Sequence, residues 1–248
     1  ISLISIDPTI QNYLLGQSLY LLSYGLIAVA ISRKEINTKR YESKMNFREY
    51  WLSVKNIYKK IRYDQVLGLI PQHFDILLLS FLGDLTLVGI YKFAKRLVEP
   101  INYIVTGFNP WIQNQYSNRK KIDFSDFVKK LLLPLSTVIL LIFITTGKKI
   151  IELIGSNEFA SAYEPMIILT FGYLIYLLTF WIRQALLFNE LIIYHAYGRL
   201  IYSFVFIILS IPLTYFFNVA GLAYSLSSAI ALQKIFEYIV YKKKIISE

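Results

Sequence analysis

The sequence predicts an all-α protein, a polytopic transmembrane helix bundle of about seven spans, and three observations carry this prediction. The 248 residues are 56% hydrophobic with a mean hydropathy of +0.50, which is more apolar than a soluble domain of this length. None of the apolar segments shows the strict alternation that predicts a membrane strand. The apolar residues form long uncharged blocks of about the 18 residues that signal a spanning helix: Gln11–Ile31, Leu131–Gly147, Pro165–Ile182 and Leu200–Phe217.

The blocks and the less apolar segments between them define seven predicted spans. The second and third are the least hydrophobic, so we expect them to lie against other helices or a cavity rather than lipid. The third is long and interrupted at Pro100 and Pro110, because proline removes a helical hydrogen bond. The spans are Gln11–Ile31, Tyr63–Leu82, Leu85–Ile112, Phe127–Gly147, Tyr163–Phe188, Gly198–Phe217 and Val219–Tyr241, with a turn at Phe217–Asn218 between the last two.

The distribution of lysine and arginine predicts the orientation of the chain. Residues 32–62 hold ten of these bases and three glutamates, which places this segment on the cytoplasmic side. The later clusters Arg119–Lys121 and Lys242–Lys244, and Arg199 in the turn between two spans, then fall on the same side; Lys148 and Lys149 do not. We expect a cytoplasmic C-terminus in a bacterial or archaeal cytoplasmic membrane. The net charge of +10 reflects this bias and argues against nucleic acid as a partner.

Within the basic segment, Asn46–Arg62 has apolar residues at helical spacing with basic residues between them. This pattern predicts an amphipathic helix, lying on the anionic leaflet or packed on the spans as a connecting helix. The chain begins with Ile1, and we expect it to be the C-terminal part of a longer protein.

Sequence motifs of catalysis are not found. The chain has no cysteine, no glycine-rich phosphate loop, no paired carboxylates in a suitable loop and no metal-ligating cluster. His73 and His195 are far apart in the sequence. We therefore expect no enzyme activity, no cofactor and no metal.

Charged residues within the second and third spans are the most informative feature. An ionised side chain in hydrocarbon costs about 2.5–3.5 kcal/mol on insertion scales, so it pairs or faces a wet cavity. Asp75 has a depth comparable to that of Lys92, and Lys92, Lys95, Arg96 and Glu99 follow helical spacing on one face. One interpretation is an internally satisfied network, in which Asp75 pairs with a base and Glu99 with Lys95 or Arg96. The other is that the surplus positive charge faces a cavity.

The segment Asp75–Glu99 resembles the paired helices that open the C-terminal lobe of polysaccharide-biosynthesis flippases. These belong to the multidrug/oligosaccharidyl-lipid/polysaccharide exporter superfamily. Two further segments resemble motifs of this family: Ile154–Tyr163 and Val219–Tyr224, the latter with one glycine fewer. The shared pattern in the first segment is an aspartate on an apolar helix, a glycine-centred turn and a Gly-x-Tyr-x-x-Ala element, formed by Asp75, Gly83, Gly89, Tyr91 and Ala94.

The resemblance covers nearly the whole chain and implies two helical lobes that face a central cavity with alternating access. Residues 1–31 would be the last helix of the N-terminal lobe, 32–62 a cytoplasmic linker, 63–241 the six-helix C-terminal lobe, and 242–248 a tail. The implied function is translocation of a lipid-linked oligosaccharide across the cytoplasmic membrane, driven by an ion gradient. The implied partners are the lipid-linked glycan, membrane lipids, the N-terminal lobe, and polysaccharide polymerase and assembly proteins.

The resemblance gives the charged residues candidate roles. Lys92, Lys95 and Arg96 are candidates to hold the substrate pyrophosphate, since their charge exceeds that of the nearby acids. Arg183 is a further candidate, with snorkelling to the cytoplasmic headgroups as the alternative. Asp75 and Glu99 are candidates for ion coupling or for charge pairing. The alternative functions are a drug or cation exporter of the same superfamily, a membrane glycosyltransferase or polymerase of surface polysaccharide, and a scaffold in glycan assembly.

Overall fold

The computed structural model describes residues 55, 67, 74–81, 85–117, 124–155 and 157–246. The chain divides into two compact units, 1–53 and 54–248, and all described residues lie in the second. The predicted first span, most of the basic linker with its amphipathic helix, and the Pro71–His73 segment lie outside the described residues. Apart from short turns, the described residues are helical and include no strand, which confirms the all-α prediction.

The labelled helices of the second unit follow one another with short connections. Residues 74–81 form a helical segment that precedes them. The elements are α4 (Leu85–Val98), α5 (Pro100–Ser117), α6 (Phe124–Phe127), the π-helix η1 (Val128–Leu132), α7 (Leu133–Gly155), the 3₁₀ helix η2 (Asn157–Ala162), α8 (Tyr163–Thr179), α9 (Trp181–Phe188), α10 (Ile192–Tyr241) and the π-helix η3 (Lys242–Ile246).

Three helical stretches of the described residues are long and apolar enough to cross a membrane. They are Val128–Gly155, Glu158–Phe188 and Ile192–Ile245. These stretches confirm the prediction of transmembrane helices, whereas the seven-span count and the two-lobe arrangement stay predictions. At the start of the first stretch, Lys130 Nζ donates a hydrogen bond to Asp126 Oδ2 (2.5 Å), which lowers the pKa of this carboxyl group.

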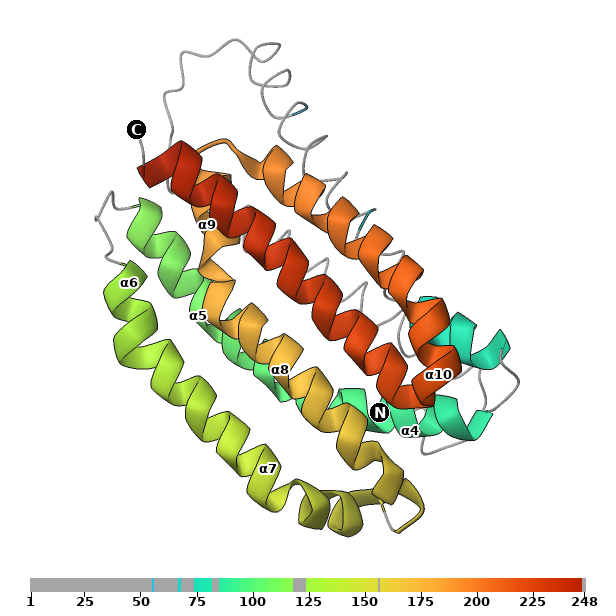
Figure 1. Ribbon diagram of the computed structural model, residues 1–248. Helices are drawn as coiled ribbons and strands as arrows, with labels where there is room; N and C mark the ends of the chain where they lie inside the picture. The colour runs from blue at the N-terminus through green and yellow to red at the C-terminus, as the bar shows by residue number, and fades with distance from the viewer. Residues whose placement is uncertain are drawn as a thin grey trace, which may run out of the picture. The chain divides into compact units, whose positions relative to one another are not determined.

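α10 is a helical hairpin, because its backbone reverses at Asn218. This residue has φ 50° and ψ −130°, a positive φ that asparagine tolerates better than most residues. The two arms run antiparallel, and each exceeds the roughly 20 residues that cross a bilayer (Figure 1). Gly221 is required at the turn, since a Cβ there would lie 1.8 Å from the carbonyl oxygen of Leu213. The predicted turn at Phe217–Asn218 is confirmed.

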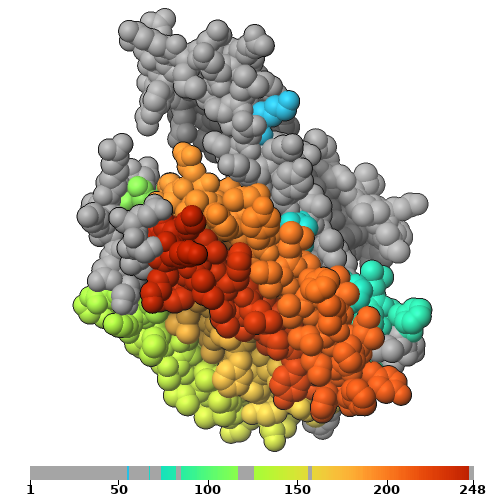
Figure 2. Space-filling view, turned by 45° about the horizontal axis from the view of Figure 1, so that its top comes forward, coloured from blue at the N-terminus to red at the C-terminus, as the bar shows by residue number. Residues whose placement is uncertain are grey.

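α8 is the central helix of the unit and contacts α4, α5, α7 and α10. Accordingly, 67% of the apolar 18-residue window in the stretch Glu158–Phe188, which contains α8, is buried. The corresponding share is 11% in Val128–Gly155, which contains α7. The second arm of α10 approaches α8 closely at Gly172, where a Cβ would lie 2.9 Å from Cα of Ser227. The two arms of α10 lie side by side on one face, which α8 and α7 continue (Figure 2).

Several predicted spans differ in detail from the observed helices. Segment 85–112 is two helices that break at Glu99, because Pro100 has no N–H to continue α4 and instead begins α5. Pro110 lies inside α5 without ending it. The segment 163–188 breaks at Phe180 into α8 and α9, which no proline or glycine predicted. α7 continues beyond the predicted end at Gly147 to Gly155.

Candidate functional site

A polar cavity of about 620 Å³ lies among α4, α5, α8, α9 and α10. Its charged lining groups are Lys95, Glu99, Arg183, Arg199 and Lys234. A cavity of this size is within the range of small-molecule sites. Four cationic side chains and one carboxylate therefore face a common space between apolar helices.

Asp75 and Lys95 form an ion pair at one side of this cavity. Lys95 Nζ lies 2.6 Å from Asp75 Oδ2, and the two side chains are 24% and 1% exposed. The pairing agrees with the interpretation that Asp75 is satisfied by a base. Among the described residues, Glu99 forms no ion pair with Lys95 or Arg96, which corrects that part of the network interpretation. Glu99 instead lies in the turn after α4, at the cavity.

The charged residues of α4 and of the turn that follows it lie in two different directions. Lys95 and Glu99, four positions apart, line the cavity, whereas Lys92 and Arg96 are exposed and do not. Successive positions on a helix are about 100° apart, so residues 95 and 96 diverge although their spacing predicts a shared face. The roles predicted for Lys92 and Arg96 stay predictions.

A buried network around Glu237 joins the two arms of α10. The Glu237 carboxylate accepts hydrogen bonds from Gln233 Nε2 (2.6 Å) and Lys234 Nζ (2.7 Å), both on its own arm. It also bonds His195 Nδ1 on the other arm at 2.8 Å. Glu237, Lys234 and His195 are 0%, 2% and 2% exposed. Glu237 and Lys234 therefore neutralise each other at an almost fully buried position beside the cavity.

The Lys234 ammonium also lies 5.1 Å from the centroid of the Tyr176 ring on α8. This cation–π contact connects the Glu237 network to the central helix. Lys234, Glu237 and the role of His195 were not predicted from the sequence. Lys234 and Glu237 could have been recognised by their i, i+3 spacing, because two opposite charges at this spacing in an apolar span share one helix face.

Arg183 and Arg199 supply the remaining positive charge from α9 and from the first arm of α10. The prediction that Arg199 lies in the turn between two spans was wrong. α10 begins at Ile192, before the predicted start at Gly198, so Arg199 is inside the helix. Gly198 allows the close approach of the arms here, since a Cβ would lie 3.0 Å from Glu237 Oε1.

Uncharged polar groups complete the lining. Gln184 Nε2, on α9, donates a hydrogen bond to Asn109 Oδ1 on α5 at 3.3 Å. Asn109 lines the cavity, together with Tyr173 and Tyr176 of α8 and Tyr202 of α10. No group of three His, Cys, Asp or Glu side chains able to hold a metal occurs in the part of the chain that the structure describes.

The charges around the cavity balance in favour of the bases. Asp75 and Glu237 pair with Lys95 and Lys234, whereas Arg183, Arg199 and Glu99 also line the cavity. Four basic side chains and one carboxylate thus line it. A guanidinium presents a planar fork of donors that suits phosphate and carboxylate oxygens. The arrangement therefore suits an anionic ligand with polar substituents.

The fold and the site define a helical membrane protein with a basic cavity between its helices. Neither protein-family models, nor curated proteins, nor solved structures provide a match to this chain.

Proposed function

We propose that this protein is a membrane flippase that translocates a lipid-linked oligosaccharide across the cytoplasmic membrane. The observation that carries the proposal is the basic cavity, in which Lys95, Arg183, Arg199 and Lys234 face one space between apolar helices. Four basic side chains against one carboxylate in the cavity lining suit a substrate that carries negative charge. The pyrophosphate of a lipid-linked glycan is such a group.

The cavity also offers groups that suit a glycan. Tyrosine rings at 173, 176 and 202 can stack on sugar rings, and Asn102 and Asn109 can exchange hydrogen bonds with hydroxyl groups. The lipid tail would stay in the bilayer. The sequence resemblance to polysaccharide-biosynthesis flippases supports the same substrate, because the resembling segment Asp75–Glu99 contributes Lys95 and Glu99 to the cavity.

Glu99 is the better of the two predicted candidates for ion coupling. Asp75 is 1% exposed and forms an ion pair with Lys95, so its role is to balance the charge of this lysine. Glu99 lines the cavity, is partly exposed, and lies in the turn between α4 and α5. A carboxylate in this position can exchange a proton or a small cation with the cavity water. We expect Glu99→Gln to reduce the dependence of transport on the ion gradient.

The test is transport of a radiolabelled polyprenyl-pyrophosphate oligosaccharide by the full-length protein in proteoliposomes. Arg183→Gln and Arg199→Gln each remove one cavity cation. A hydrogen bond to a charged group contributes about 1.5–3 kcal/mol, so each change should weaken substrate binding by roughly tenfold to a hundredfold. Lys149→Gln, which neutralises an exposed base on α7, is the matched control and should transport as the wild type does.

Wild-type transport by the Arg183→Gln/Arg199→Gln double variant would contradict the proposal. Equal transport of a neutral polyprenyl-linked glycan would contradict it as well, since the cavity charge would then have no role. A separate variant, Lys92→Ala/Arg96→Ala, tests the roles predicted for these two exposed bases. Loss of transport there, with the cavity arginines intact, would assign the pyrophosphate to the exposed side of α4.

A further inference from the structure

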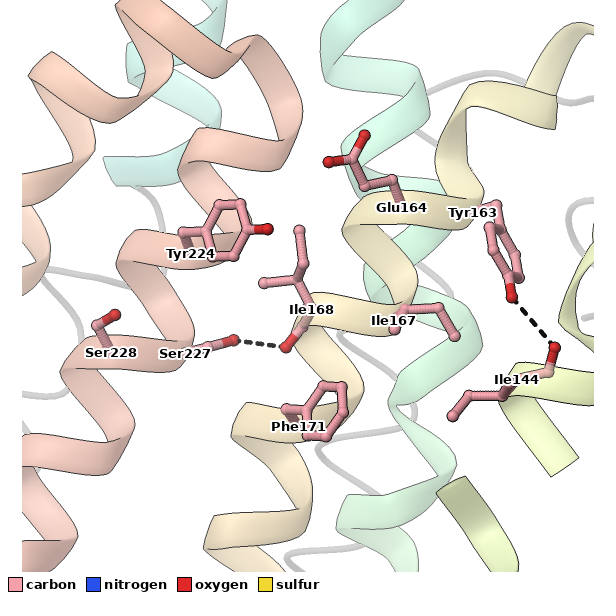
Figure 3. A pocket seen from close by; sticks show the side chains of 9 residues that line it. All are labelled: Ile144, Tyr163, Glu164, Ile167, Ile168, Phe171, Tyr224, Ser227 and Ser228. Carbon is pink, nitrogen blue, oxygen red and sulfur yellow. Dashed lines mark hydrogen bonds between the residues drawn. The ribbon is translucent and has the colours of Figure 1, made fainter. Parts of the chain in front are cut away.

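A second cavity lies on the other side of the α8–α10 pair. It is an open groove of about 590 Å³ between α7, α8 and the second arm of α10 (Figure 3). Its lining is mainly apolar, with Ile144 of α7 and Ile167, Ile168 and Phe171 of α8. The size is within the range of ligand sites. The flanking helices are the stretches long and apolar enough to cross a membrane, so the groove opens at bilayer depth.

The groove and the basic cavity use opposite faces of the same two helices. On α8, Ile168 and Phe171 line the groove, whereas Tyr173 and Tyr176 line the cavity. On the second arm of α10, residues 224, 227 and 228 face the groove and residues 226, 230 and 233 the cavity.

The α8–α10 contact closes the wall between the two sites. Ser227 Oγ donates a hydrogen bond to the carbonyl oxygen of Ile168 at 2.8 Å, and Gly172 lets the backbones meet (Figure 3). The α8–α10 contact therefore lies between the mainly apolar groove and the basic cavity.

The groove has a charged and polar end near the start of α8. Glu164 is exposed there, and the Tyr224 ring of α10 lies across the groove from it (Figure 3). Tyr163 OH donates a hydrogen bond to the carbonyl oxygen of Ile144, and Lys148 Nζ of α7 lies 5.2 Å from the centroid of the Tyr163 ring. The Glu164 carboxylate of α8 thus lines this end of the groove, and the Lys148 ammonium of α7 lies beside Tyr163, which also lines it.

We propose that the groove binds one bilayer phospholipid with a zwitterionic headgroup. The acyl chain lies along Ile167, Ile168 and Phe171, the headgroup ammonium meets Glu164, and the headgroup phosphate meets Lys148. An anionic headgroup without an amine has no favourable partner for Glu164 and is repelled by it. The bound chain fills the space between α7 and the α8–α10 pair. The proposal goes beyond the flippase function and rests only on the membrane location of these helices.

Native mass spectrometry of the full-length protein tests the proposal. The protein, purified in detergent, is mixed with phosphatidylethanolamine or phosphatidylglycerol of identical acyl chains, and the lipid retained per chain is counted. We expect one phosphatidylethanolamine to be retained severalfold more than phosphatidylglycerol. Glu164→Lys, a change at an exposed site that does not disturb the core, should reverse this preference.

A second variant tests the groove itself. Ser228→Trp places a large ring in the groove and should reduce retention of both lipids. The matched controls are Glu152→Lys and Val138→Trp, at exposed positions of α7 outside the groove, and they should retain lipid as the wild type does. Equal retention of the two lipids by the wild type would overturn the proposal, as would unchanged retention in Glu164→Lys and Ser228→Trp. Lipid retention is measured without transport, so this result is independent of the proposed flippase activity.

Discussion

Replacing Glu237 by glutamine removes the only carboxylate of the buried network that joins the two arms of α10, as far as the described residues show. The carboxylate is 0% exposed and holds Lys234, which is 2% exposed, at 2.7 Å. Glutamine keeps the shape but leaves the Lys234 ammonium buried with no opposite charge within the network. Breaking a buried pair in this way costs about 3–5 kcal/mol of unfolding free energy. We therefore expect Glu237→Gln to lower stability by about this amount.

The double variant Lys234→Met/Glu237→Gln should lose less than the sum of the single variants, because it removes the stranded charge. Direct contacts couple by about 0.5–3 kcal/mol, and we expect the upper part of this range. The measurement is the free energy of unfolding in mixed micelles, from denaturant titration followed by far-UV circular dichroism. Glu152→Gln, an exposed glutamate on α7, is the control and should change stability by less than about 0.5 kcal/mol. A loss below about 1 kcal/mol for Glu237→Gln, or additive losses in the double variant, would refute the reasoning.

Three other changes have defined outcomes in the same unfolding assay. Asp75→Asn should cost about 1.5–3 kcal/mol, because it removes the charged acceptor of the Lys95 hydrogen bond, and Lys95→Met in the same chain should recover part of this loss. Asn218→Gly should be neutral or stabilising by up to about 1 kcal/mol, whereas Asn218→Val should cost about 1–3 kcal/mol at the positive φ; equal stability of the two variants would contradict this. Gly172→Leu should cost at least about 1–3 kcal/mol through overpacking, while Gly89→Leu, which enters open space, should be tolerated; a similar cost at both would show that the close contact has no role.

Part of the candidate site was predictable from the sequence. Lys95, Glu99 and Arg183 were identified because a charge inside an apolar span is costly and needs a partner or water. The structure brings these three residues to one cavity, while Lys92 and Arg96 lie outside it. From their spacing alone, Lys92, Lys95, Arg96 and Glu99 were predicted to share one helix face. The rotation of α4 about its axis depends on its neighbours, and Lys95 faces inward, where it forms an ion pair with the buried Asp75.

The sequence by itself determined that the chain forms membrane helices, because the apolar blocks have the length that a bilayer requires. It also predicted an interruption at Pro100, where α4 gives way to α5, and the turn at Asn218. Only the tertiary structure decided that Arg199 and the Glu237 network belong to the basic cavity, and that a separate groove lies behind α8. Both results depend on helix packing between segments far apart in the chain, which the local periodicity of a sequence does not encode.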